Sequence, residues 1–399
     1  MKHLYGEDTM STERRIRTVT MLQVPDRVPV SPLIYYFAAH YVGITNYELY
    51  EPGKYKRAID ACFYELGPWD AYYFMHVYYP ELASFLVPMK VKEPGFDLPP
   101  DSIRQYMEER IMDTEDYEWL EATCKSNPRL AYLKLFMRLI PRIWGHIGEG
   151  WRCRAYMYPR MIRNAVLYAR EFKTWRERGV TLMYSVGVEA PFDIFSLSRG
   201  LKDFVRDLRD RPAEVAAAAE ALTVPYGFRI KALCRIMGVR RAIIDVHRSS
   251  NDFISPRIFK ELSFPSLKVL VEVLAAEGIT SILHCDGDWD LNLETLRELP
   301  VGRVIAQFDG RTDIFRAKEI IGDRMCIYGD VPASMLVLSS ESEVDEYCHR
   351  LIEEVGKGGG FILGSGCEVP PNANSENVRT MLHSVRKYGY YDPAVAPSY

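Results

Sequence analysis

Short apolar runs and longer amphipathic segments alternate along the chain from about residue 180 onward. The runs are rich in strand-forming residues and occupy 181–187, 242–247, 281–285, 303–308, 325–330 and 361–366. Largely apolar runs of this length are typical of strands that are buried on both faces of a parallel sheet. Their spacing, roughly 20 to 60 residues from strand to strand, predicts successive βα units.

The segments between the runs carry recognisable helix ends. Three helices are bracketed by an opening serine and a closing glycine, from Ser255 to Gly278, from Ser340 to Gly356 and from Ser375 to Gly389, and the first two serines are predicted caps. The first 60 residues indicate a helical lead-in followed by an apolar stretch, and residues 68–175 form an aromatic, irregular region. Within that region we expect a strand near 69–74 and helices around 113–124 and 131–138.

These elements predict a (β/α)8 barrel with an N-terminal helical lead-in and insertions. The predicted organisation is a single domain over residues 1–399, with 1–60 as an N-terminal extension. A doubly wound open sheet is the alternative. No Gly-x-Gly-x-x-Gly or P-loop motif follows a strand, which disfavours a nucleotide-binding version of that alternative.

The composition is that of an ordinary globular protein, with 48% hydrophobic and 26% charged residues. The formal net charge of −4 argues against a dedicated nucleic-acid binder. No run of 18 apolar residues and no apolar leader occur, so neither a membrane span nor secretion is expected. The eight cysteines form no Cys-x-x-Cys pair, which indicates reduced thiols and a cytoplasmic protein.

In a barrel, the active site lies at the C-terminal ends of the strands. The polar residues at those ends are Glu189, Asp193, Asp245, His247, His284, Cys285, Asp286, Asp309, Asp330 and Cys367. They combine imidazole, thiol and carboxylate groups, which are the ligands that zinc prefers.

The densest cluster is His-Cys-Asp-Gly-Asp-Trp at 284–289. Because side chains alternate along a strand, His284 and Asp286 point to one side and Cys285 to the other. His284 and Asp286 could therefore converge on one metal ion. Cys367, just past another strand end, is a further candidate metal ligand, and Glu189 is either a metal ligand or a general base. Core packing is the alternative for a histidine or cysteine in a strand, and we expect it for the six cysteines other than Cys285 and Cys367.

Other strand ends suggest further roles. Asp245, His247 and Glu189 are candidates for acid–base catalysis, although a carboxylate at a strand end also often caps the next helix. Arg248 either binds a substrate carboxylate or phenolate or forms a local ion pair. Trp289 and Asp330 complete the candidate substrate-binding residues. The 26 tyrosines gather in stretches such as 33–41, which either line an aromatic pocket or pack in the core.

Several stretches in order resemble the uroporphyrinogen decarboxylase-like superfamily of barrels. They are VEAPFDIFSLSRGLKDFVRDLRDRPAEV, the FISP element at 253–256, HCDG, YGDVPASML and GGGFILGSGCEVPPNANSENVRTML. The resemblance covers about residues 180–390 and implies a (β/α)8 barrel. True decarboxylases of this superfamily carry an N-terminal Arg-Gln-Ala-Gly-Arg element for substrate carboxylates, and this chain has RVPVSPLIYYFAAHYVGIT in the comparable region.

The corrinoid-dependent methyltransferases are the other branch, and their zinc site uses a His-x-Cys element and a distant cysteine. His284 and Cys367 match two of these ligands, whereas Asp286 stands at the usual cysteine position. This pattern implies a zinc enzyme that moves a methyl group between a small donor or acceptor and the cobalamin of a partner corrinoid protein. The harder ligand set and the tyrosines favour a methoxylated, aromatic donor.

Three other functions stay open. They are a uroporphyrinogen decarboxylase-type carboxy-lyase, a non-catalytic barrel that binds a small molecule, and another lyase or transferase on the same barrel. The sequence also leaves the oligomeric state open, with a homodimer as one option.

Overall fold

The computed structural model describes residues 4–392, and the chain forms two compact units. The first unit contains the residues up to 76, 169–184 and those from 282 onward. The second unit contains residues 77–168 and 185–281. The single domain predicted over 1–399, with its extension at 1–60, stays a prediction.

The first unit is built around parallel strands that follow one another in chain order. These strands are β7 (Thr280–Cys285), β8 (Val304–Phe308), β9 (Cys326–Val331) and β10 (Phe361–Ser365). Ile305 of β8 lies opposite Cys326, and Leu363 of β10 lies opposite Gly329. All residues of these strands are buried, as the apolar runs predict.

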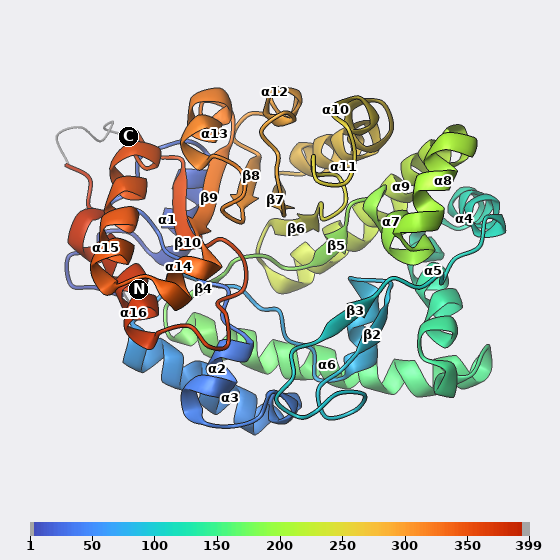
Figure 1. Ribbon diagram of the computed structural model, residues 1–399, viewed down its shortest axis with the longest axis horizontal. Coiled ribbons are helices and arrows are strands. Elements are labelled where there is room, and N and C mark those ends of the chain that lie inside the picture. Colours follow the sequence, from blue (N-terminus) through green and yellow to red (C-terminus); the bar gives the residue numbers. More distant parts are fainter. Residues whose placement is uncertain (1–3, 393–399) are drawn as a thin grey trace. The chain divides into compact units, whose positions relative to one another are not determined.

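Helices cover these strands, and Figure 1 shows α13, α15 and α16 beside β9 and β10. The α-helices of this unit are α1 (Thr12–Thr20), α2 (Tyr36–Val42), α3 (Pro52–Ala61), α12 (Leu293–Leu296), α13 (Ile314–Ile321), α14 (Ala333–Leu338), α15 (Glu341–Arg350) and α16 (Ser375–Tyr388). Shorter turns are η1 (Asn46–Tyr50), η2 (Cys62–Leu66) and η6 (Leu351–Val355).

The apolar stretch after the lead-in lies along β10. Val30 forms a parallel bridge with Leu363, and Leu33 forms one with Glu368. The first unit also contains the short strands β1 (Ala71–Tyr72) and β4 (Thr181–Leu182), which pair in parallel.

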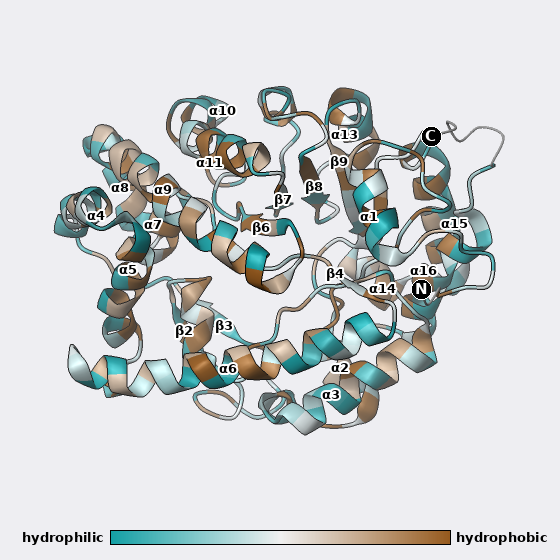
Figure 2. Cartoon of the chain, turned by 180° about the vertical axis from the view of Figure 1, so that it is seen from behind, coloured by the Kyte–Doolittle hydropathy of each residue, from teal (hydrophilic) through white to brown (hydrophobic). Residues whose placement is uncertain are grey.

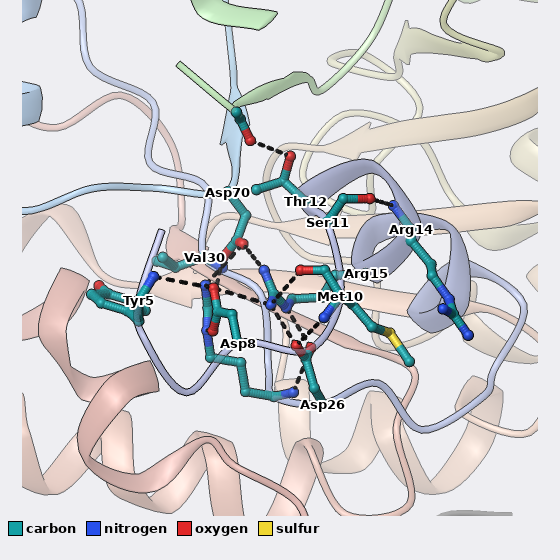
Figure 3. Close-up of polar contacts among 12 residues, drawn as sticks. Tyr5, Asp8, Met10, Ser11, Thr12, Arg14, Arg15, Asp26, Val30 and Asp70 are labelled. Atoms are coloured by element: carbon teal, nitrogen blue, oxygen red, sulfur yellow. Dashed lines mark hydrogen bonds and ion pairs between the residues drawn. The ribbon is translucent and has the colours of Figure 1, made fainter. Parts of the chain in front are cut away.

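A buried ion-pair network joins the lead-in to the residue before β1. Figure 3 shows Arg15 among three aspartates, and it contacts Asp26 at 2.7 Å and Asp70 at 2.6 Å. Arg27 contacts Asp8 and Asp70, each at 2.8 Å. Burial opposes ionisation of Asp70, but the guanidinium groups of Arg27 and Arg15 lower its pKa below the usual range.

The second unit contains the parallel pair β5 (Gly187–Glu189) and β6 (Arg241–Asp245), and the antiparallel pair β2 (Lys90–Lys92) and β3 (Gln105–Met107). Its longest helices are α6 (Trp151–Glu177), which continues into the first unit, and α9 (Pro212–Met237). The others are α4 (Glu115–Ser126), α5 (Pro128–Ile143), α7 (Asp193–Arg199), α8 (Leu201–Asp210), α10 (Pro256–Ile258) and α11 (Phe264–Ala276), with turns η3 (Pro80–Phe85), η4 (Gly145–Ile147) and η5 (Phe259–Ser263). Helix α9 contacts α4, α5 and α11.

Five of the six predicted strands are confirmed within a residue or two, but the run at 181–187 is not one strand. Within this run, the backbone changes its hydrogen-bonding partner from β1 to β6. The amide of Met183 donates to the carbonyl oxygen of Tyr72 in β1, whereas the amide of Ser185 donates to that of Arg241 in β6. The run is therefore divided between β4 and β5.

The region 68–175 is more regular than the sequence indicates. The strand near 69–74 and the helices around 113–124 and 131–138 are present as β1, α4 and α5. The long helix α6 was not predicted, because it has apolar residues on its exposed as well as its buried side. Figure 2 shows hydrophobic and hydrophilic bands alternating along this helix.

The predicted helix ends are largely confirmed. Ser255 accepts a hydrogen bond from the Ile258 amide (3.3 Å), and Ser340 forms a capping box with Glu343. Ser375 is the first residue of α16, as predicted, and the Asn374 side chain before it caps the helix by accepting from the Glu376 amide.

All eight cysteines carry free thiols, and Cys367 is the one that is not fully buried. Between residues 4 and 392, no helix combines the length and apolar character that crossing a bilayer would require.

Candidate metal centre

Three predicted ligands come together in the first unit. His284 is the penultimate residue of β7, Asp286 directly follows that strand, and Cys367 follows β10. The His284 Nε2 atom lies 3.1 Å from Asp286 Oδ1 and 4.0 Å from Cys367 Sγ. One ligand atom from each residue lies within 4.8 Å of the other two. Because the three donors are nitrogen, oxygen and sulfur, the group offers the ligand set of a zinc site.

The strand geometry separates Cys285 from this group. Its side chain is fully buried, and its thiol contacts the Leu283 carbonyl oxygen at 3.6 Å. Cys285 is accordingly not one of the clustered donors.

The loop that carries Asp286 is fastened to the next loop along the sheet. The Asp309 carboxylate accepts from the Gly287 amide at 2.8 Å, and Thr312 accepts from the Trp289 amide at 3.0 Å. Gly287 has a positive φ of 84°, a conformation that favours glycine. Asp309 therefore supports the ligand loop from outside the cluster.

Trp289 also belongs to this support. Its side chain is fully buried, and its indole N–H donates to the Asp286 carbonyl oxygen at 3.0 Å. The role of Trp289 in substrate binding stays a prediction.

The loop that carries Cys367 approaches its neighbours closely. A Cβ atom on Gly366 would lie 2.5 Å from the Asp309 carbonyl oxygen, so a larger residue does not fit there. The carboxylate of Glu368 accepts from the Tyr36 amide at 2.9 Å. The buried aromatic residues Tyr35 and Tyr36 thus lie in a segment that is hydrogen-bonded next to Cys367.

The electrostatics of the cluster centre on His284. Burial by itself would lower the pKa of His284, but the neighbouring Asp286 carboxylate raises that pKa well above the usual value. A cation at this place is thus favoured by the carboxylate.

Sequence reasoning missed a buried polar residue in the parallel strands of the first unit. Gln307 is fully buried in β8, where it lies opposite Tyr328 of β9. The Tyr73 hydroxyl lies 3.4 Å from the Gln307 side-chain oxygen, and the Gln307 side-chain nitrogen has no hydrogen-bond partner among the described residues. The signal was present, because Gln307 is the one polar side chain within the run VIAQF.

A second group of predicted residues lies in the second unit. Glu189 and Asp245 are opposite each other at the ends of β5 and β6, and His247 Nδ1 lies 3.2 Å from Glu189 Oε1. Burial raises the pKa of Glu189 to about 8, against the opposing effect of His247. Glu189 and His247 therefore form a pair that can hold a proton near neutral pH. The role of Glu189 as a fourth metal ligand stays a prediction.

Asp193 and Arg248 organise the loop after β6. The Asp193 carboxylate accepts from the Arg248 amide at 2.8 Å and from the Ser249 hydroxyl. Burial raises the pKa of Asp193 to about 6. The Arg248 guanidinium pairs with Glu108 and covers the Phe253 ring at 4.7 Å. Of the two alternatives for Arg248, the structure shows the local ion pair.

Asp330 is held by a helix of the first unit. Its carboxylate is buried and accepts from the Tyr347 hydroxyl of α15 at 2.8 Å. The role of Asp330 in substrate binding stays a prediction.

Comparison with known proteins places the chain in a family. The family model described as uroporphyrinogen decarboxylase (URO-D) matches residues 172–388. The uroporphyrinogen decarboxylase of Thioalkalivibrio sulfidiphilus is 25% identical over 43% of this chain, and that of Pseudoalteromonas atlantica is 24% identical over 34%. The matches span 47% and 38% of those relatives, so the chain covers about half of their length or less.

A solved structure extends the similarity to nearly the whole chain. A methyltransferase from Methanosarcina mazei shares the fold with a TM-score of 0.65, over 95% of this chain and 99% of that protein, at 16% identity. Together with the parallel βα units, this confirms the predicted (β/α)8 barrel class. Because the family model matches more than half of its residues, the chain belongs to the uroporphyrinogen decarboxylase (URO-D) family.

Proposed function

We propose that this protein is a zinc-dependent methyltransferase that moves a methyl group between a small substrate and the cobalamin of a partner corrinoid protein. The convergence of His284, Asp286 and Cys367 is the observation that carries the proposal. The fold shared with a protein named as a methyltransferase supports it.

The donor set fits the proposed metal. Its three atoms come from the end of β7, the loop after β7 and the loop after β10, and the hydrogen bond that Asp309 accepts from Gly287 fixes the loop of Asp286. A zinc ion bound there would supply a Lewis acid for a substrate oxygen or sulfur atom. Because Asp286 replaces a sulfur donor by oxygen, we favour an oxygen substrate such as a methoxyl compound.

The surrounding side chains support an aromatic substrate. Tyr35 and Tyr36 lie in the segment bound to Glu368, directly after the ligand Cys367. Gln307 adds a buried amide that can donate to a polar substituent of the substrate. Glu189 and His247 belong to the second unit and are our predicted acid–base pair there, because the buried Glu189 carboxyl retains a proton near pH 7.

Decarboxylation is the second candidate, because the two curated relatives carry that name. A substrate with several carboxylates needs cationic partners. Arg27 is the one arginine in the segment from 27 to 45, and its guanidinium is already paired with Asp8 and Asp70 in the buried network. This favours methyl transfer over decarboxylation of a polycarboxylate.

Metal analysis of the full chain tests the proposal. We expect about one zinc ion per protein, and we expect His284→Ala and Cys367→Ala each to lower zinc affinity by at least ~100-fold. The control is His349→Ala, which removes a histidine that stacks on Tyr388 outside the cluster. Zinc binding that both ligand variants leave unchanged would refute the metal site.

Activity assays separate the functions. Zinc-dependent loss of methyl groups from a methoxylated aromatic compound, with methylation of a corrinoid protein, would support the proposal. Metal-independent release of CO2 from a tetrapyrrole carboxylate would support the decarboxylase instead. Affinity for the aromatic compound without turnover would indicate a binding barrel.

A further inference from the structure

Helix α6 carries an apolar stripe that is open to solvent. Trp151 is 69% exposed, Ile162 66%, Val166 46% and Tyr158 40%. Ala155 is exposed between them. Single exposed apolar residues are common, but a continuous row of large ones along one helix indicates an interaction surface.

The stripe lies opposite the side by which α6 is anchored. Cys153, Met157 and Asn164 are buried, and the Asn164 side chain accepts from the Tyr78 amide at 3.1 Å. At about 100° per residue, these three positions lie on one side of the helix, and Trp151 and Ile162 lie roughly 180° away. The second unit therefore fixes the stripe in an outward orientation.

The spacing of the stripe is that of a helix-packing seam. Positions 151, 155, 158 and 162 follow one another at intervals of four, three and four residues, and Val166 lies one turn further on. The first three intervals have the heptad spacing by which one helix packs along another. The small residue Ala155 lies between Trp151 and Tyr158, which leaves room for a side chain of a facing helix.

The flanks of the stripe are strongly basic. Residues 151–168 contain four arginines and no acidic residue. Arg152, Arg154 and Arg163 are exposed, and none of them pairs with a carboxylate among the described residues. A second copy of α6 would bring like charges together, whereas a helix with flanking carboxylates would neutralise them.

We infer that this face of α6 docks an acidic amphipathic helix of another protein. A heptad seam favours a helix over an anionic lipid surface, because a fluid lipid surface imposes no 3.5-residue repeat. The inference uses neither the ligand cluster nor the Glu189–His247 pair. It therefore stands or fails independently of the proposed chemistry.

Peptide binding to the full chain tests the inference. The probe is a heptad peptide with leucine at the a and d positions and glutamate at e and g, and its partner control carries lysine in place of glutamate. We expect the acidic peptide to bind and the basic one not to bind. Ile162→Asp should weaken binding about tenfold or more. Ile236→Asp, at a position 75% exposed on α9, should leave binding unchanged.

A charge exchange makes the test independent of the apolar contact. The double variant Arg152→Glu, Arg163→Glu should lose the acidic peptide and gain the basic one, since it reverses the sign of the flanks. Thermal unfolding of each variant checks that it is folded. If Ile162→Asp does not fold, peptide binding by the double arginine variant tests the inference by itself.

Three results would overturn the inference. They are no binding of the acidic peptide, binding that neither Ile162→Asp nor the charge exchange alters, and loss of self-association, measured by sedimentation, as the main effect of Ile162→Asp. Binding to phosphatidylserine vesicles in place of the peptide would identify a lipid surface and overturn it as well.

Discussion

Asp286 is partly exposed, and the residue before it, Cys285, turns its thiol into the core. A carboxylate oxygen is a harder donor than a thiolate, so the donor at this position would decide which metals and substrates a site there favours.

Replacing Asp286 with cysteine tests this difference. We predict that Asp286→Cys binds zinc more tightly and favours a thiol substrate over a methoxyl compound. The absorption of the cobalt(II)-substituted protein is the measurement, because its sulfur-to-metal charge-transfer band grows with each added thiolate. Cys285→Ser serves as the control and should leave that band as it is. An unaltered band in Asp286→Cys would count against Asp286 as a ligand.

Asp330 gives a second prediction at the scale of the residue. Burial raises the pKa of Asp330 from 3.8 to about 7, although the Tyr347 hydrogen bond opposes the shift. Between these values the native state binds more protons than the unfolded state, so Asp330 lowers stability as pH rises through this window. We predict that Asp330→Asn removes this pH-dependent loss of stability. At pH 8 the variant should have a higher free energy of unfolding than the unaltered protein, measured by urea unfolding at several pH values.

Asp345 provides the matched control, because it too accepts from a tyrosine hydroxyl, that of Tyr388 at 2.7 Å. Burial opposes its ionisation, but the hydrogen bonds from Lys387 and Tyr388 lower the pKa of Asp345. Asp345→Asn should therefore reduce stability at neutral pH, the opposite sign. Equal behaviour of the two variants would contradict the role of burial at Asp330.

At the scale of the element, the capping box of α15 was readable from sequence. Ser340 accepts from the Glu343 amide, and the Glu343 side chain accepts from the Ser340 amide at 2.7 Å. We predict that Ser340→Ala lowers the free energy of unfolding by about 1 kcal/mol, measured by thermal unfolding. Ser342→Ala, in the same first turn but outside the box, should change it by less than ~0.5 kcal/mol. Equal losses in both variants would argue against the cap.

Helix α6 shows where local patterns fail. Its buried side is marked by Cys153 and Met157, but its exposed side carries Trp151 and Ile162, so a single hydrophobic face is not visible in the sequence. Pro159 inside the helix adds a second misleading signal, because proline usually ends a helix. The prediction of one strand at 181–187 was wrong for another reason. The backbone changes its hydrogen-bonding partner between Met183 and Ser185, and this change depends on tertiary structure and not on the local sequence.

At the scale of the whole molecule, the buried network of Figure 3 connects parts of the first unit that are far apart in sequence. Arg15 and Arg27 are fully buried and share Asp70, which lies 43 residues beyond Arg27. A buried ion pair adds little over an apolar pair, but removing one partner leaves an uncompensated charge.

We predict that Arg27→Met lowers the free energy of unfolding by about 3 to 5 kcal/mol, measured by urea unfolding. The control is Arg257→Met, which breaks an exposed pair with Glu261, where the arginine side chain is 74% exposed. That change should be less than ~1 kcal/mol. A loss of similar small size in Arg27→Met would show that the network is dispensable.

The sequence by itself determined the parallel βα units, most helix ends and the candidates His284, Asp286 and Cys367, because apolar periodicity, caps and strand ends are local properties. Tertiary structure alone decided which candidates meet. It brought Cys367 to His284, turned Asp330 toward Tyr347 and buried Trp289 under its own loop. The physical reason is that a ligand set or a buried charge depends on atoms that converge from distant segments, and no local pattern records that convergence.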